Sequence, residues 1–162
     1  MIHPRGGDAR GQVALYAVLL FPILMLVFAL VLTVGTLEGA RARTRAQLDM
    51  AALTATQALD FAALAQGQPP SLVAAEADRL AREYLVRNLA TLELPVPAGS
   101  IAATAEVNVM APGDRDPISG EVVSVPTVSI RAVVPTRVPL LNLIGLGPIV
   151  NVSVSGSAGA RT

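Results

Sequence analysis

Twenty consecutive residues near the N-terminus carry no charge: Val13-Ala-Leu-Tyr-Ala-Val-Leu-Leu-Phe-Pro-Ile-Leu-Met-Leu-Val-Phe-Ala-Leu-Val-Leu32. A helix rises about 1.5 Å per residue, so this run is roughly 30 Å long and matches the hydrocarbon core of a bilayer. Its Leu, Val, Ile and Phe side chains each favour insertion by about 0.3–0.6 kcal/mol, and together they outweigh Pro22. The run therefore predicts a transmembrane helix, which we place at residues 12–37.

A cleaved secretory signal is the alternative interpretation of this run. Its apolar region would be long for a signal, and the best small-residue cleavage site, Ala40-Arg41-Ala42, contains an arginine. Arginines flank the run on both sides, so charge distribution does not fix the orientation. A short leader, residues 1–11, precedes the helix and the domain follows it. We therefore expect a cytoplasmic N-terminus and a periplasmic or extracellular domain.

Apolar residues continue at helical spacing beyond the membrane segment. The stripe consists of Leu37, Ala40, Thr44, Leu48, Ala51, Ala52, Ala55, Leu59 and Ala62. It predicts an amphipathic continuation of the same helix over residues 38–66, which Gly67-Gln-Pro-Pro70 would end. Residues 71–162 are then expected to form an extracytoplasmic domain.

The domain begins with a second predicted helix, with Ser71 as its N-cap and an end near Leu92. On it, two acid-before-base pairs four residues apart, Asp78 with Arg82 and Glu83 with Arg87, are typical of a solvated helix face. Apolar residues then alternate with polar ones over residues 101–109, 122–134 and 149–157, which predicts three strands. Pro126 is expected at an edge or bulge of the second strand.

These elements predict an α+β fold. It consists of the long N-terminal helix, a second helix, and a small antiparallel sheet of about three strands packed on the outer half of the long helix. The apolar stretch 138–146 between the last two strands is expected to be a helical turn or a loop packed on the sheet.

Composition excludes several classes of function. Net charge is zero, so no overall basic field exists to recruit nucleic acid. The chain has no cysteine, which excludes disulfides and thiolate metal sites. The single histidine, His3, excludes a Ser-His-Asp triad and a cage of several histidines. We expect neither an enzyme nor a cofactor.

The order of these parts resembles a known family. A short basic leader ending in glycine, an apolar helix and a small α+β domain look like a type IV pilin or pseudopilin. More narrowly, the chain resembles the TadE/TadG-like proteins of the tight-adherence (Tad/Flp) pilus assembly system. The stretch that carries the resemblance is Arg10-Gly-Gln-Val-Ala-Leu-Tyr-Ala-Val-Leu-Leu-Phe-Pro22. It continues in Arg41-Ala-Arg-Thr-Arg-Ala-Gln-Leu-Asp-Met-Ala-Ala-Leu53, which is similar to the family's Gln-x-x-x-Asp-x-Ala-Ala-Leu pattern. It covers residues 10–58 specifically and the remainder only in architecture.

The resemblance implies membrane insertion and leader removal by a prepilin peptidase between Gly11 and Gln12. It also implies partners: other pilin or pseudopilin subunits and the pilus assembly platform, in contact with the lipid bilayer. The chain departs from the pilin pattern at Tyr16, where a glutamate usually stands at the fifth mature position. Tyr16 is uncharged at neutral pH and cannot pair with the terminal amine of a neighbouring subunit. The departure favours a TadG-like anchored component or a minor subunit over the major pilin.

Candidate site residues lie mainly on the long helix. Arg41, Arg43 and Arg45 follow the apolar run, where they would anchor the helix at the membrane interface, or bind lipid phosphates or an acidic partner. Small residues allow helices to approach closely. We therefore expect the alanine-rich face of Ala51 and Ala55 to pack partly on the chain's own sheet and partly on neighbouring subunits. Tyr16 and Pro22 complete the predicted assembly set.

The loop at Asp114-Arg-Asp116 gathers the only oxygen donors that suggest a cation. Calcium needs six or more oxygens, and the spacing does not match the helix–loop–helix calcium pattern. An ordinary solvent-exposed loop is the favoured interpretation, with a calcium site as the alternative.

The function expected from the whole sequence is that of a membrane-anchored structural or assembly subunit, a pseudopilin or minor pilin. The alternative is a permanently anchored extracytoplasmic binding module that does not enter a filament.

Overall fold

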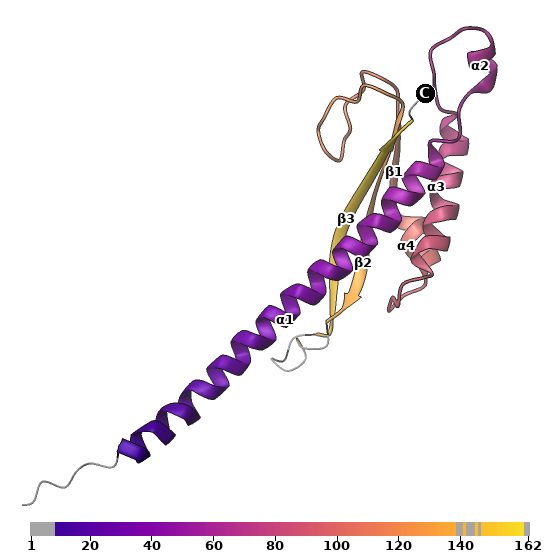
Figure 1. Cartoon of the computed structure of the whole chain (residues 1–162). Coiled ribbons are helices and arrows are strands. Elements are labelled where there is room, and N and C mark those ends of the chain that lie inside the picture. The colour runs from indigo at the N-terminus through magenta and orange to yellow at the C-terminus, as the bar shows by residue number, and fades with distance from the viewer. Residues whose placement is uncertain (1–8, 139–140, 142–144, 146, 161–162) are drawn as a thin grey trace, which may run out of the picture.

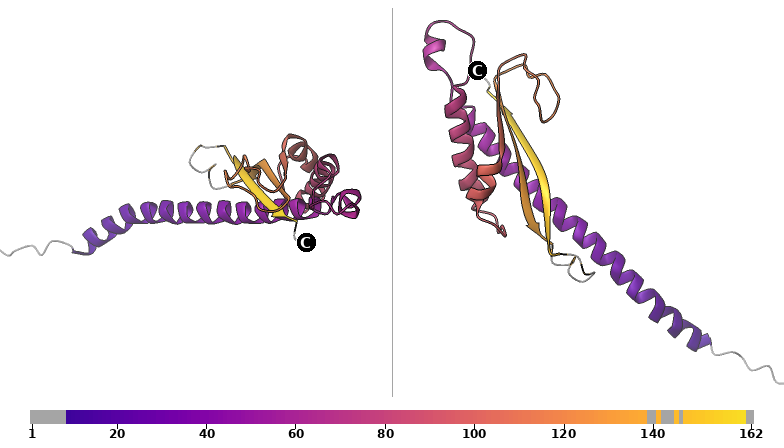
Figure 2. Two further views of the ribbon diagram at one scale, coloured as in Figure 1. Left: turned by 90° about the horizontal axis from the view of Figure 1, so that it is seen from above. Right: turned by 180° about the vertical axis from the view of Figure 1, so that it is seen from behind.

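One helix runs through most of the length of the molecule (Figure 1). The computed structural model describes residues 9–138, 141, 145 and 147–160, with side chains described from Tyr16 onward. Helix α1, Ala9–Ala55, has 47 residues. Its first half projects away from the domain, and its second half crosses the sheet (Figures 1 and 2). The predicted α+β fold, with a pilin-like layout, is confirmed.

Three shorter helices and one sheet complete the described chain. The elements after α1 are α2 (Phe61–Ala65), α3 (Ala74–Leu89), α4 (Ala98–Thr104), β1 (Glu106–Met110), β2 (Thr127–Arg137) and β3 (Ile149–Gly159). The strands form an antiparallel sheet in the order β1-β2-β3. All three predicted strands exist, and the third matches its predicted start at residue 149.

The core lies between α1, α3 and one face of the sheet. The predicted stripe on α1 is buried where it meets the domain: Leu48, Ala51, Ala52 and Ala55 have no exposed surface. Helix α3 contributes a row of buried residues at intervals of four, namely Ala77, Ala81, Leu85 and Leu89. Small side chains on both helices let the two backbones approach closely, which suits a core with few aromatics.

The predicted continuation of α1 to residue 66 is wrong, because α1 ends at Ala55. The chain reverses instead through an isolated bridge between Leu59 and Leu72. The Asp60 N–H donates to the carbonyl of Ser71 at 2.9 Å, and the Val73 N–H donates to the carbonyl of Ala58 at 2.8 Å. Leu59 therefore continues the apolar pattern as part of this bridge and not as a turn of α1.

The second helix begins later and ends earlier than predicted, at Ala74–Leu89. Ser71 is not its N-cap, because the Ser71 carbonyl belongs to the bridge with Asp60, and Val73 occupies the N-cap position without a side-chain bond. Both predicted ion pairs form: Arg82 lies 3.1 Å from Asp78, and Arg87 lies 2.6 Å from Glu83.

The first predicted strand is wrong over residues 101–104, which form the end of α4. Alanine fits either structure, so the alternation of Ile101, Ala103 and Ala105 did not discriminate between them. Arg82 stabilises the helical alternative from outside this segment. Its Nη1 donates to the carbonyl of Ala102 at 2.8 Å and to that of Ala105 at 3.2 Å, at the helix end where carbonyls lack partners within the helix.

The second strand begins at Thr127 and not at residue 122. Pro126 precedes the strand and is neither its edge nor a bulge, although its carbonyl accepts the Ala160 N–H at 2.8 Å. A different proline, Pro135, lies inside β2. It pairs with Asn151 in β3, beyond the last β1 partner at Arg131, so its missing N–H faces a side of β2 with no neighbouring strand.

The inner face of the sheet is formed by the even-numbered residues of β2, Val128, Ile130, Ala132 and Val134, which are nearly or fully buried. The odd-numbered residues point to the outer face. There the connection between β1 and β2 covers Ser129, which is fully buried. The prediction for residues 138–146 falls largely outside the described residues.

Candidate functional site

The first half of α1 exposes its apolar side chains to the surroundings. From Tyr16 to Val34 most side chains are exposed, including Phe21, Leu24, Phe28 and Val31. Within the described residues, one helix is long and apolar enough to cross a membrane. A soluble protein rarely leaves such a large contiguous apolar surface uncovered, so this part of α1 requires an apolar environment.

The residues predicted to take part in processing and assembly lie on α1. Gly11 and Gln12 lie in the first turns of α1. The Tyr16 side chain is 69% exposed. Pro22 lies inside the helix without breaking it, and the first turns are inclined to the rest of the helix (Figure 2). Proline lacks the N–H that would bond one turn back, so Pro22 removes one hydrogen bond from this part of the helix.

Ala51 and Ala55 are not available to a partner. Both have no exposed surface and belong to the chain's own core. This corrects the expectation that they pack partly on neighbouring subunits. Met50, 55% exposed, and Leu53, 50% exposed, lie on the outward side of the same turns. These two residues form a second exposed apolar patch on α1, separate from the one that ends at Val34.

The three arginines after the apolar run divide between two flanks of α1. Arg41 and Arg45 are four residues apart and share one helix face, whereas Arg43 points to another. Arg43 lies near Glu93 and Arg137 at the end of the sheet closest to the first half of α1. Only Arg41 and Arg45 therefore belong to the surface described next.

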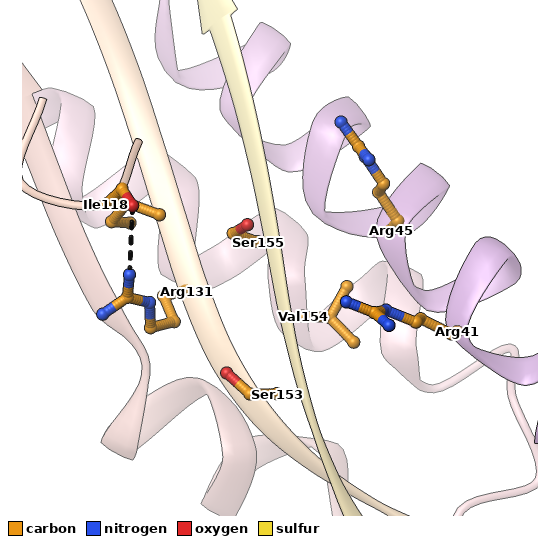
Figure 3. A pocket seen from close by; sticks show the side chains of 7 residues that line it. All are labelled: Arg41, Arg45, Ile118, Arg131, Ser153, Val154 and Ser155. Atoms are coloured by element: carbon orange, nitrogen blue, oxygen red, sulfur yellow. Dashed lines mark hydrogen bonds between the residues drawn. The ribbon is translucent and has the colours of Figure 1, made fainter. Parts of the chain in front are cut away.

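Arg41 and Arg45 line a depression of about 350 Å³ beside β3. Figure 3 shows them extending from α1 on one side of β3, with Arg131 of β2 and Ile118 on the other. Ser153, Val154 and Ser155 complete the lining. We call this depression, defined by Arg41, Arg45, Ile118, Arg131 and residues 153–155, the arginine groove.

Positive charge in the arginine groove is only weakly compensated. Arg45 lies 3.9 Å from Asp49, and Arg131 lies 3.8 Å from Glu106, both long for ion pairs and both partly exposed. Arg131 also donates to the carbonyl of Ile118 at 3.3 Å. Arg41 has no acidic partner within 4 Å among the described residues. The groove therefore has the electrostatic character of an anion-binding surface.

The carboxylates of Asp114 and Asp116 are both engaged by their own loop. Asp114 accepts the Ala111 N–H at 2.8 Å. Asp116, 4% exposed, accepts bonds from the Ile118 N–H, the Ser119 hydroxyl and the Ser129 hydroxyl at 2.8–2.9 Å. Burial raises the pKa of Asp116, but these three donors outweigh burial and hold the pKa below its usual value.

The loop is largely solvent-exposed, as the sequence predicts, but the Asp116 side chain is buried and its carboxylate is engaged by the loop's own donors. Asp116 holds the loop onto the outer face of the sheet through Ser129. Among the described residues, no group of three or more acidic or histidine side chains is placed to hold a metal ion.

Two surface features were not predicted from the sequence. Met50 and Leu53 fall outside the apolar stripe that faces the core, and two exposed apolar residues on a helix carry little signal alone. Arg131 occupied an ordinary polar position in an alternating strand. Its approach to Arg41 and Arg45 depends on how α1 crosses the sheet, which local periodicity does not specify.

Comparison with known proteins identifies no relative. No family model matches the chain, and neither a curated protein nor a solved structure matches it significantly.

Proposed function

We propose that the protein is a membrane-anchored structural subunit, a pseudopilin or minor pilin of a Tad/Flp-type pilus system. The observation that carries the proposal is the division of α1. One continuous helix exposes apolar side chains over its first half and forms the core of an α+β domain with its second half. This division suits a subunit that is held in a bilayer and then associates laterally with other helices.

The partner surface in this proposal is the outward side of α1. Large exposed apolar residues cover α1 from Tyr16 to Val34 and occur again at Met50 and Leu53. The first group would contact lipid and neighbouring helices in the bilayer, and the second would contact other subunits outside it. Outside the bilayer, removing apolar side chains from water favours association. Within the bilayer, close van der Waals packing between helices favours it.

A second candidate function is a permanently anchored binding module whose domain faces away from the cytoplasm. Tyr16 favours it, because a tyrosine in the exposed apolar part of α1 cannot supply the buried carboxylate through which pilins are thought to recruit one another. The arginine groove would then be the binding surface of the module.

Intact-mass and N-terminal peptide analysis of the protein from its native membrane separates the two functions. A mature chain that begins at Gln12 would show that a prepilin peptidase accepts Tyr16, and would support the pilus subunit. A chain that retains residues 1–11 in the membrane fraction would contradict leader processing and favour the anchored module. Protease treatment of sealed vesicles measures the orientation in the bilayer. If the N-terminus is cytoplasmic, the domain is protected in inside-out vesicles and digested in right-side-out vesicles.

A further inference from the structure

The outer edge of β3 is open along the arginine groove. Successive residues of a strand direct their backbone groups to alternate sides. The Ala160 N–H donates to Pro126 and the Val138 N–H donates to Pro148, in register with the β2–β3 ladder, so even-numbered residues of β3 bond toward β2. Odd-numbered residues therefore direct their N–H and C=O groups away from the sheet.

One of these outward backbone groups has a hydrogen-bond partner on α1, which confirms that odd-numbered residues of β3 point away from β2. The Ser157 N–H donates to the side chain of Asp49 at 3.1 Å. Ser153 and Ser155 lie two and four residues earlier and share this orientation. No residue that the structure describes donates to or accepts from their outward backbone groups. They form part of the arginine groove, so unpaired backbone groups and weakly compensated guanidinium groups lie at the same place.

We propose that the arginine groove binds an extended acidic segment of a partner protein. The backbone of that segment would pair with the outer edge of β3 at Ser153 and Ser155, as a strand added to a sheet edge. Its carboxylates would pair with Arg41 and Arg45 on one side and Arg131 on the other. Guanidinium groups bind carboxylates through paired, charge-assisted hydrogen bonds, which gives the groove its preference for acidic side chains.

The position of the groove favours a protein partner over lipid phosphate. Residues 13–37 of α1 carry no charge, and the middle of this range is Met25. A core of about 30 Å centred there ends near Gly35 in an upright helix, so Arg45 lies about 15 Å further out. The headgroup layer is only about 5–8 Å deep on each side. Arg45 and the sheet edge therefore lie beyond the lipid phosphates. This inference does not depend on the pilus assignment.

Peptide binding to the full-length protein in nanodiscs of uncharged lipid tests the proposal. The probe is a fluorescent peptide that carries glutamates at adjacent positions, so that carboxylates lie on both faces of the added strand, and its binding is measured by anisotropy at two salt concentrations. Two comparison peptides carry glutamine for glutamate, or proline for the residues that would donate to β3. We expect the acidic peptide to bind and high salt to weaken its binding. Each comparison peptide should bind with an affinity lower by about tenfold or more.

The variant pair is Arg41→Gln with Arg45→Gln, both exposed, against the matched control Arg43→Gln with Arg87→Gln. The first pair should lose about tenfold or more in affinity, and the control should bind as the wild type does. Equal binding by both pairs, or equal binding of the proline peptide, would overturn the proposal. So would binding to anionic vesicles that depends on Arg41 and Arg45 without any binding of the acidic peptide, which would assign the groove to lipid.

Discussion

Gly156 lies where α1 and the sheet approach each other closely. A Cβ atom added there would lie 2.5 Å from Asp49 Oδ1, 2.8 Å from the Asp49 backbone nitrogen and 2.9 Å from the Cβ of Leu48. Two of these three atoms are fixed by the helix and cannot turn aside. Glycine therefore allows β3 to lie against α1, and the adjacent Ser157 N–H reaches the Asp49 carboxylate as a result.

Replacing Gly156 with alanine is expected to destabilise the domain by about 1–3 kcal/mol, because the added methyl group forces α1 and β3 apart. Urea denaturation followed by circular dichroism measures the change. Gly99→Ala is the matched control: the added Cβ at position 99 of α4 meets nothing within 4 Å, and alanine is the better helix former. An unchanged unfolding free energy for Gly156→Ala would show that α1 and β3 are not held at this distance.

Asp116 has a comparable role on the other face of the sheet. Its lowered pKa means that the folded protein prefers the ionised carboxylate. The resulting stabilisation is fully present above the ordinary aspartate pKa of about 4. It is lost as the pH falls through the lower pKa of the folded state.

Asp116→Asn is expected to lower the free energy of unfolding by about 1–3 kcal/mol at neutral pH, since the amide accepts fewer of the three bonds and brings donors of its own. The difference from the wild type should shrink as the pH falls below about 4, where the wild-type carboxylate also becomes protonated. Unfolding curves of both proteins between pH 2 and 7 measure it. A difference that stays constant over this range would contradict an ionised Asp116 as the source.

At the scale of the element, α1 works in two environments at once. Apolar residues surround the first half of the helix. In the second half the core-facing side is apolar, as at Leu48, and Met50 is exposed on the outward side. One half of the helix is therefore suited to an apolar environment, and the other half contributes to the core of the domain. A partner that binds the outward side of α1 contacts a single continuous helix. Its position is further fixed by α3, whose Asn88 side chain donates to the carbonyl of Gln47 at 3.2 Å.

Met50→Glu combined with Leu53→Glu is expected to abolish co-purification with partner subunits while leaving the fold intact, because both side chains lie outside the core. Cross-linking and affinity purification from native membranes measure association, and circular dichroism checks the fold. Val122→Glu with Val133→Glu is the matched control, since these valines are 60% and 53% exposed away from α1. Unchanged association in the α1 variant would remove this surface from the proposed interface.

At the scale of the whole molecule, the exposed first half of α1 makes little contact with the domain. Thr44 is the first strongly buried residue along α1, and the core members on this helix begin at Leu48. The part before them contributes apolar surface to its surroundings but little to the core. The domain should therefore fold without the exposed first half of the helix.

A fragment of residues 38–162 is expected to be a soluble, cooperatively folding protein, because it retains every buried residue of α1. Size-exclusion chromatography and thermal unfolding measure this. A fragment of residues 56–162, which lacks Leu48, Ala51, Ala52 and Ala55, should fail to fold, since α3 and the sheet would face water across the missing helix. Aggregation of the longer fragment would contradict the separation of anchor and domain.

Much of this architecture was predictable, because its signals are local. A charge-free run of membrane length, the buried stripe from Thr44 to Ala55, and the alternation in β3 each follow from the spacing of neighbouring residues. The errors fall where composition fits two structures or where a contact comes from a distant segment. The α4 helix was predicted as a strand because alanine fits both, and α1 was extended too far because the Leu59–Leu72 bridge joins separate parts of the chain.

The sequence by itself determined that an apolar helix begins the chain, that an α+β domain follows, and that disulfides and histidine-based sites are excluded. Only the tertiary structure decided which residues form surfaces. It buried Ala51 and Ala55, left Met50 and Leu53 outside, and brought Arg131 to the same groove as Arg41 and Arg45. The reason is geometric. Periodicity predicts on which face of its own helix or strand a residue lies, whereas the crossing of α1 over the sheet determines which other residues that face contacts.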